Sequence, residues 1–189
     1  MSENKVQFNL KNVHYAVLTE STQGTVSWGT PVAVKGAVKL SLDPQGDITP
    51  FYADGIVYYQ SVANNGYSGD LEMARITYAM LKDIWGYTEG STSKVLTENA
   101  LVEPKAFALL FQIDGDAGEE YYTLYNCTGT RPAISSKTNT ETKEPQTQTT
   151  TISAVPLANG NIMARTTSET PAATKTAWFS SVFVESSSK

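Results

Sequence analysis

The chain has 189 residues, with 14 basic and 19 acidic side chains, a formal net charge of −5 and 17% charged residues. This length suffices for one sizeable core, and the acidic balance disfavours non-specific adhesion to nucleic acid or to an anionic membrane. One cysteine excludes an internal disulfide, the first residues lack the apolar run of a secretory signal, and no run of about 18 apolar residues marks a membrane span. We therefore expect one soluble domain, residues 1–189, assembled in a reducing cytosol without membrane contact.

Alternation of apolar and polar residues predicts short strands along most of the chain. Residues 11–19 are almost continuously apolar, as in a strand buried on both faces. In residues 37–42 the alternation places Val38, Leu40 and Leu42 on one face. Further strands are expected at residues 67–73, 106–113, 121–127, 147–155 and 161–165, with turns at 114–118 and 158–160. The pattern predicts a mainly β protein, a sandwich or barrel of about seven or eight strands.

One flanking helix is predicted where the apolar spacing changes, at residues 77–85. Its apolar stripe consists of Tyr78, Leu81 and Trp85, with Met80 and Ile84 beside them. Thr77 is suited to the N-cap and Gly86 to the C-terminal end. A short C-terminal helix is a second candidate, with Thr170 as its cap and Pro171 at its first position. The stretch at residues 178–184 fits a strand equally well.

Two polar segments are expected to be mobile loops inside the domain. Residues 43–51 carry two prolines and a glycine, and residues 135–148 contain no apolar side chain. Strand-like runs that need partners lie on both sides of each segment, so neither is a domain linker.

Few residues in the sequence are candidates for catalysis or metal binding. His14 is the one histidine and lies within an apolar strand, where a structural role is favoured over a metal site. Cys127 lacks an evident base, and core packing is favoured over a nucleophilic role. The acidic run at residues 114–120 resembles part of a calcium loop, although a solvated hairpin tip accounts for it better. We expect no catalytic residue, no metal and no cofactor.

The segment at residues 51–59 is rich in aromatic and β-branched side chains and follows a proline-flanked loop. Such a segment is prone to associate edge to edge unless it is covered. It fits equally a hairpin in the core and a hairpin arm that packs on a neighbouring subunit.

Five segments together resemble the major tail protein family of phages and prophages of Gram-positive bacteria with long non-contractile tails. They are residues 12–16 (NVHYA), 40–47 (LSLDPQGD), 51–54 (FYAD), 64–72 (NNGYSGDLE) and 124–128 (LYNCT). The resemblance extends over residues 11–165, and residues 166–189 resemble the family less. Its motifs are individually weak and are specific as an ordered set.

The resemblance implies a structural virion protein that forms stacked rings, usually hexameric, around the lumen of a tail tube. The implied partners are further copies of the chain and other tail proteins (tape measure, tail terminator and distal tail protein). Genomic DNA would pass through the lumen without specific binding, along an acidic or neutral wall. Residues 42–59 are the expected inter-subunit arm, with contacts at Asp43, Pro44, Pro50, Phe51, Tyr52, Tyr58 and Tyr59. The protein would be assembled in the host cytoplasm and located in the virion tail.

The alternative from another class is a carbohydrate-binding module of a phage tail or host-recognition device. Such a module would bind its sugar with exposed tyrosine or tryptophan. Of the candidates Trp28, Trp85 and Trp178, only Trp28, in a Gly/Thr-rich stretch, looks free for it. A calcium-dependent enzyme built on residues 114–120 ranks last.

Overall fold

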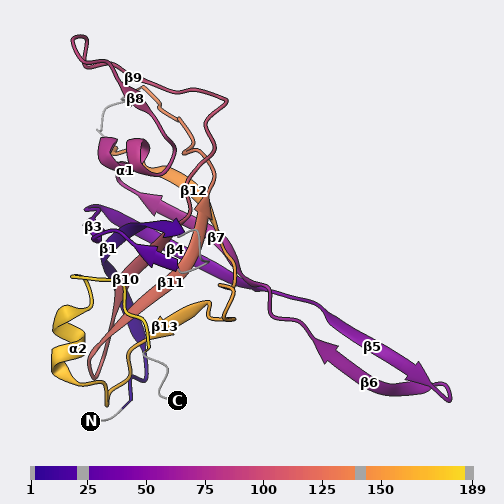
Figure 1. The fold of residues 1–189 in the computed structure, drawn as a ribbon. Helices are drawn as coiled ribbons and strands as arrows, with labels where there is room; N and C mark the ends of the chain where they lie inside the picture. Colours follow the sequence, from indigo (N-terminus) through magenta and orange to yellow (C-terminus); the bar gives the residue numbers. More distant parts are fainter. Residues whose placement is uncertain (1–2, 21–25, 139–143, 186–189) are drawn as a thin grey trace.

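The computed structural model describes residues 3–20, 26–138 and 144–185, and within them the protein is mainly β (Figure 1). The strands are β1 (Gln7–Glu20), β2 (Val26–Trp28), β3 (Val32–Ala33), β4 (Ala37–Gln45), β5 (Ile48–Ala53), β6 (Ile56–Val62), β7 (Gly66–Met73), β8 (Thr88–Glu89), β9 (Leu96–Thr97), β10 (Phe107–Gly115), β11 (Glu119–Gly129), β12 (Gln148–Ala154) and β13 (Met163–Arg165). The helices of the described part are α1 (Tyr78–Asp83) and α2 (Ala172–Ala177). The predicted fold class is confirmed.

Nine strands form one antiparallel sheet in the order β2-β1-β10-β11-β12-β7-β4, with β13 beside β11 and β3 beside β1. The sheet curves so that its last strand, β4, comes close to β1 again. Just before β4, the amide of Val34 donates to the carbonyl oxygen of Val13 in β1 at 2.8 Å. The curvature encloses the main core, as in a partly closed barrel.

The central strand β10 is buried on both faces. Because successive side chains of a strand point to opposite faces, Phe107 and Leu109 enter the main core while Ala108 and Leu110 enter a second cluster. The turn after β10 lies where the sequence predicts it, and the amide of Gly115 donates to the carbonyl of Gly118 at 2.9 Å.

The C-terminal segment covers the second cluster. Trp178, directly after α2, is buried against Ala16 and Leu110 and stacks on Phe183 with ring centroids 5.2 Å apart. The expected C-terminal helix is present at residues 172–177, and residues 178–185 form neither the alternative strand nor a continuation of the helix. Pro171 is the N-cap of α2 and not its first helical residue, a shift of one position from the prediction.

Helix α1 closes one end of the main core. Thr77 caps it by accepting a hydrogen bond from the amide of Met80 at 3.2 Å, and Gly86 has the positive φ, 67°, that was expected after the helix. Trp85, just past the helix end, is buried and donates from Nε1 to the carbonyl of Gly129 at 3.0 Å. This bond ties the helix region to β11.

The predicted apolar stripe of α1 is partly wrong. Met80 and Ile84 are buried and Leu81 packs at the edge of the core, but Tyr78 is exposed, with its ring 5.0 Å from the Arg75 guanidinium. The helix has only six residues, so one narrow side of it faces the core and its first residue lies outside that side.

The prediction that Val38 shares a face with Leu40 and Leu42 is also wrong. Val38 is exposed, whereas Leu40 and Leu42 pack against the core. The register of β4 against β7 shifts between Ala37 and Lys39, which marks a β-bulge. A bulge inserts one residue and moves the side chains before it to the other face. Ala37 therefore packs on the core in place of Val38.

The two predicted mobile loops have different outcomes. Residues 43–51 form the end of β4 and most of β5, so they are largely strand and not a loop. Residues 139–143 lie outside the described residues, and the described parts of residues 135–147 form no strand or helix. No helix in the described part of the chain is long and apolar enough to cross a membrane.

Candidate assembly interface

A two-stranded hairpin projects away from the body of the protein (Figure 1). It consists of β5 and β6, which pair with each other and with none of the other described strands. We call residues 46–64 the arm. Its strands, of six and seven residues, are about 20 and about 24 Å long at roughly 3.4 Å per residue.

The tip of the arm is a tight two-residue turn. Ala53 pairs with Ile56, and the residues between them, Asp54 and Gly55, both have positive φ, 51° and 77°. A type I′ turn requires positive φ at both central positions, and Asp-Gly is among its preferred sequences. The turn sequence thus specifies a hairpin.

The base of the arm is continuous with the sheet. The amide of Ala63 donates to the carbonyl of Asp47 at 3.0 Å, and the amide of Asn65 to that of Gln45 at 2.8 Å. These bonds connect the β5–β6 ladder to the β4–β7 ladder, so the arm is an extension of the body ribbon.

The surface of the arm is apolar and exposed. Eight large side chains have exposed fractions from 49% to 71%: Ile48, Phe51, Tyr52, Ile56, Val57, Tyr58, Tyr59 and Val62. None of them belongs to either core cluster. The only charged residues of the arm are Asp47 and Asp54, and it has no lysine, the side chain that most often protects an open strand edge.

The total surface of the chain is large for its mass. It exposes 12403 Å², about 3,500 Å² more than the roughly 8,900 Å² of a compact monomer of this size. Permanent subunit interfaces bury about 2,000 to 5,000 Å². About half of that area comes from each partner, so the excess of this one chain is larger than its share of a single interface.

The structure places the predicted contact residues in two groups. Asp43 and Pro44 lie in β4, paired with Ser68 and Tyr67 of β7, and so belong to the body. The other five, Pro50, Phe51, Tyr52, Tyr58 and Tyr59, lie on the arm. The predicted segment ends at residue 59 and omits Val62, although the β-branched run and the Asp-Gly turn signal are present in the sequence.

Trp28 is not a free aromatic platform. Its Nε1 donates to the carbonyl of Tyr125 at 2.9 Å, and its ring packs against the second cluster. Two shallow hollows, of about 330 and 180 Å³, flank it beside Val26 and Val184. The face that a sugar ring would need is thus partly covered by the chain itself.

The acidic turn at residues 114–120 is held by its own neighbours. Lys11 Nζ lies 3.0 Å from Asp114 Oδ2. Burial opposes ionisation of Asp114, but hydrogen bonds from Lys11, Asn9 and Gln112 hold the pKa of its carboxyl below the ordinary value. No group of three or more His, Cys, Asp or Glu among the described residues is arranged to hold a metal ion.

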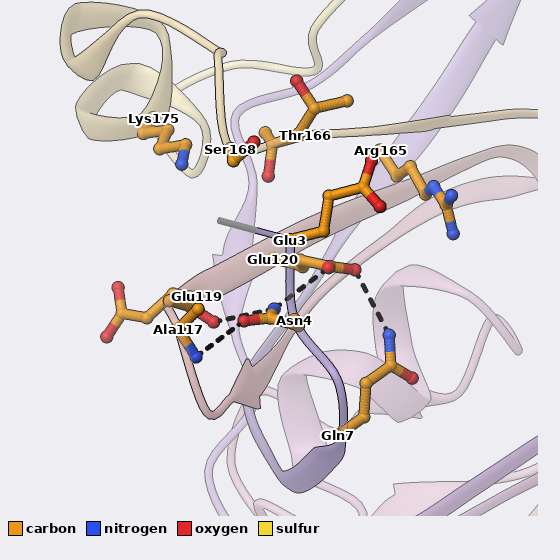
Figure 2. Close-up of a pocket in the computed structure, with 12 residues that line it drawn as sticks. Glu3, Asn4, Gln7, Ala117, Glu119, Glu120, Arg165, Thr166, Ser168 and Lys175 are labelled. Atoms are coloured by element: carbon orange, nitrogen blue, oxygen red, sulfur yellow. Dashed lines mark hydrogen bonds between the residues drawn. The ribbon is translucent and has the colours of Figure 1, made fainter. Parts of the chain in front are cut away.

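A polar cavity of about 260 Å³ lies beside this turn (Figure 2). Asn4 reaches into the turn, donating to Gly118 O and Glu120 Oε1 at 3.0 Å each and accepting from the Ala117 amide at 2.9 Å. Gln7 donates to the other oxygen of Glu120 at 3.2 Å. These bonds fasten the N-terminal segment to the β10–β11 hairpin.

His14 and Cys127 lie in different clusters. His14 stacks on Phe179 of the second cluster at 4.6 Å, while Cys127 is fully buried in the main core. Burial raises the pKa of the Cys127 thiol to about 12. The prediction that Cys127 packs in the core is confirmed.

Comparison with known proteins gives little. No family model and no curated protein matches the sequence. Among solved structures, the chain is similar to the tube-terminating cap of the anti-feeding prophage, at 12% identity and a TM-score of 0.46. The match covers 88% of this chain and 97% of the cap. A likeness this distant does not assign the chain a function.

Proposed function

We propose that the protein is a structural subunit of a phage tail tube, which assembles with its own copies into stacked, hexameric rings. The observation that carries the proposal is the arm, an ordered hairpin whose apolar side chains are exposed and unused by the protein's own core. The sequence resemblance to major tail proteins over residues 11–165 supports it. The proposal assigns the protein no catalytic role.

The energetics of the arm favour a bound partner. An isolated two-stranded hairpin is marginally stable in water. Burying one large apolar side chain contributes roughly 1.5–3 kcal/mol, so covering even half of the eight on the arm outweighs a substantial ordering cost. In the proposed tube, the neighbouring subunit supplies the cover that the body lacks.

The proposed assembly uses the arm in rings and tubes and not in a closed dimer. When the arm of one subunit binds a neighbour that does not bind back with its own arm, the contact is heterologous. Heterologous contacts generate rings when the rotation closes and filaments when it does not. A tail tube uses both, with closure within a ring and continuation between rings.

We assign the wall of the DNA conduit to the outer face of β4, β7 and β12. Its residues pair across the three strands and are all polar: Lys39, Ser41, Asp43, Ser68, Asp70, Glu72, Thr149, Thr151 and Ser153. Asp70 accepts from the Thr151 hydroxyl at 2.8 Å and Glu72 from that of Thr147 at 2.6 Å. Three carboxylates against one lysine give a wall that repels the DNA backbone weakly and lets it slide.

This assignment has a direct test in an infectious particle. The change of Asp70 and Glu72 to lysine puts positive charge where DNA would pass, so DNA ejection is expected to slow markedly at low salt. Ser68→Thr is the matched control. Ejection at the unaltered rate from fully assembled lysine-variant tails would contradict the assignment.

The arm is tested by its removal. Gln45 and Gly66 lie directly opposite each other, so a two-residue Asn-Gly turn in place of residues 46–65 closes the β4–β7 hairpin without the arm. We expect the armless variant to unfold at nearly the wild-type temperature but to remain monomeric by light scattering at concentrations where the wild type assembles. Assembly of the armless variant like the wild type would overturn the proposal.

A further inference from the structure

We propose that each arm is held between two other copies of the chain, one on each face of the hairpin. This inference rests on the proposed function, because it specifies how the arm is used in the assembly. It follows from the distribution of apolar side chains over the two faces.

Strand pairing assigns the side chains to faces. Residues directly opposite each other share a face, and successive residues of a strand alternate between faces. The first face carries the pairs Ile48–Val62 and Tyr52–Val57, and the second face the pairs Phe51–Tyr59 and Ala53–Ile56. Tyr58 is the extra residue of a bulge between these registers.

Both faces are equally exposed. Tyr52 on the first face is 63% exposed and Phe51 on the second is 60% exposed. Neither face of the arm therefore packs against the body of its own chain. A contact from one side alone would leave the other aromatic face in water.

Strand β7 in the body shows the residue pattern of a strand with one buried face and one solvent-exposed face. In β7, Leu71 and Met73 are buried, while the alternate residues Ser68, Asp70 and Glu72 are polar. A hairpin laid on a single neighbour would be expected to alternate in the same way. The middle and tip of the arm do not alternate, since Gln60 is the only polar residue on either face between Ser61 and the turn.

Copies of the same chain are the occupants that the stoichiometry favours. In a tube, every subunit carries one arm, so two receiving surfaces are needed for each arm. Only the chain itself is present in that proportion throughout the tube. The excess surface of about 3,500 Å² over a compact monomer is enough for an arm covered on both faces together with its receiving surfaces.

The test compares the two faces at matched positions. The variants are Tyr52→Ser with Val57→Ser on the first face, and Phe51→Ser with Tyr59→Ser on the second. Gln60→Ser, a polar change in the same hairpin, is the control. Because none of these side chains packs in a core cluster and the arm has no tryptophan, the tryptophan fluorescence spectrum and the unfolding temperature of the body should not change.

We expect each double variant to raise the concentration needed for assembly by about a hundredfold or more, because each loses two buried apolar side chains. A photo-crosslinking residue at position 52 should capture a different surface of the neighbouring chain from one at position 51. If one double variant assembles like the wild type, or if both positions capture the same surface, the two-sided contact is overturned. If the wild type fails to assemble even with tail-tip proteins, the proposed function itself fails, and the two-sided contact fails with it.

Discussion

Gly66 is the residue at which the second strand of the arm enters the sheet, and its backbone can be formed only by glycine. Its φ is 104°, and a Cβ at this position would lie 1.9 Å from the carbonyl oxygen of Ala154 in β12. Gly46, across the ribbon, has φ 151° and would place a Cβ 2.0 Å from Ala63 O. These two glycines allow the strands at the arm base to approach so closely.

We predict that Gly66→Ala destabilises the protein by about 2 kcal/mol or more, because the substitution combines a strained φ with a backbone clash. Gly118→Ala is the control, since a Cβ there meets nothing within 4 Å and its φ is not in the left-handed region. Urea unfolding of both variants measures the difference. Equal stability of Gly66→Ala and wild type would contradict the prediction and mean that the backbone at the base of the arm can adopt another conformation.

At the scale of elements, strands with one buried face were the most predictable. The alternation of β7 in the sequence matches the faces that its side chains occupy, with Leu71 and Met73 buried and Asp70 exposed. The two-residue strands β3, β8 and β9 are too short to show a period and were missed. Val38 was assigned to the wrong face because a bulge changes the face without leaving a mark in the alternation.

The arm was predictable in kind but not in extent. The aromatic run and the Asp-Gly turn indicate a hairpin, and the sequence alone leaves open whether it lies in the core or outside it. That distinction depends on which strands complete the sheet, since the interior is already filled by β10, β11, β12 and α1. The local sequence pattern does not show which strands fill the interior and which remain outside it.

We predict that the amides of the arm exchange with solvent rapidly in the monomer and slowly in the assembled protein. In the monomer the β5–β6 ladder has solvent on both faces and both edges, so opening it exposes no core. Hydrogen exchange read by mass spectrometry measures this, with peptides from β10 as an internal reference for the core. Arm amides that are already protected like β10 in the monomer would contradict the need for a partner.

At the scale of the whole molecule, the protein combines a well-filled body with an arm that has no place in it. The sheet is buried on its inner face by the main core and, at its centre, on its outer face by the C-terminal segment. The arm adds surface without adding core. In the proposed subunit, the body therefore provides the stability, and the arm provides the contact with neighbouring subunits.

The assembly should respond little to salt. The arm has two charged residues against eight large apolar ones, so apolar burial dominates the proposed contact. Screening of surface charge weakens ion pairs but leaves apolar burial intact.

Light scattering combined with negative-stain electron microscopy is the sharpest test of the proposed tube, on the purified full-length protein over a concentration series with and without tail-tip proteins. We predict rings or hollow tubes that appear above a threshold concentration, persist at high salt and form more readily when tail-tip proteins are added. A strict monomer at every concentration, with and without those proteins, would contradict the proposal.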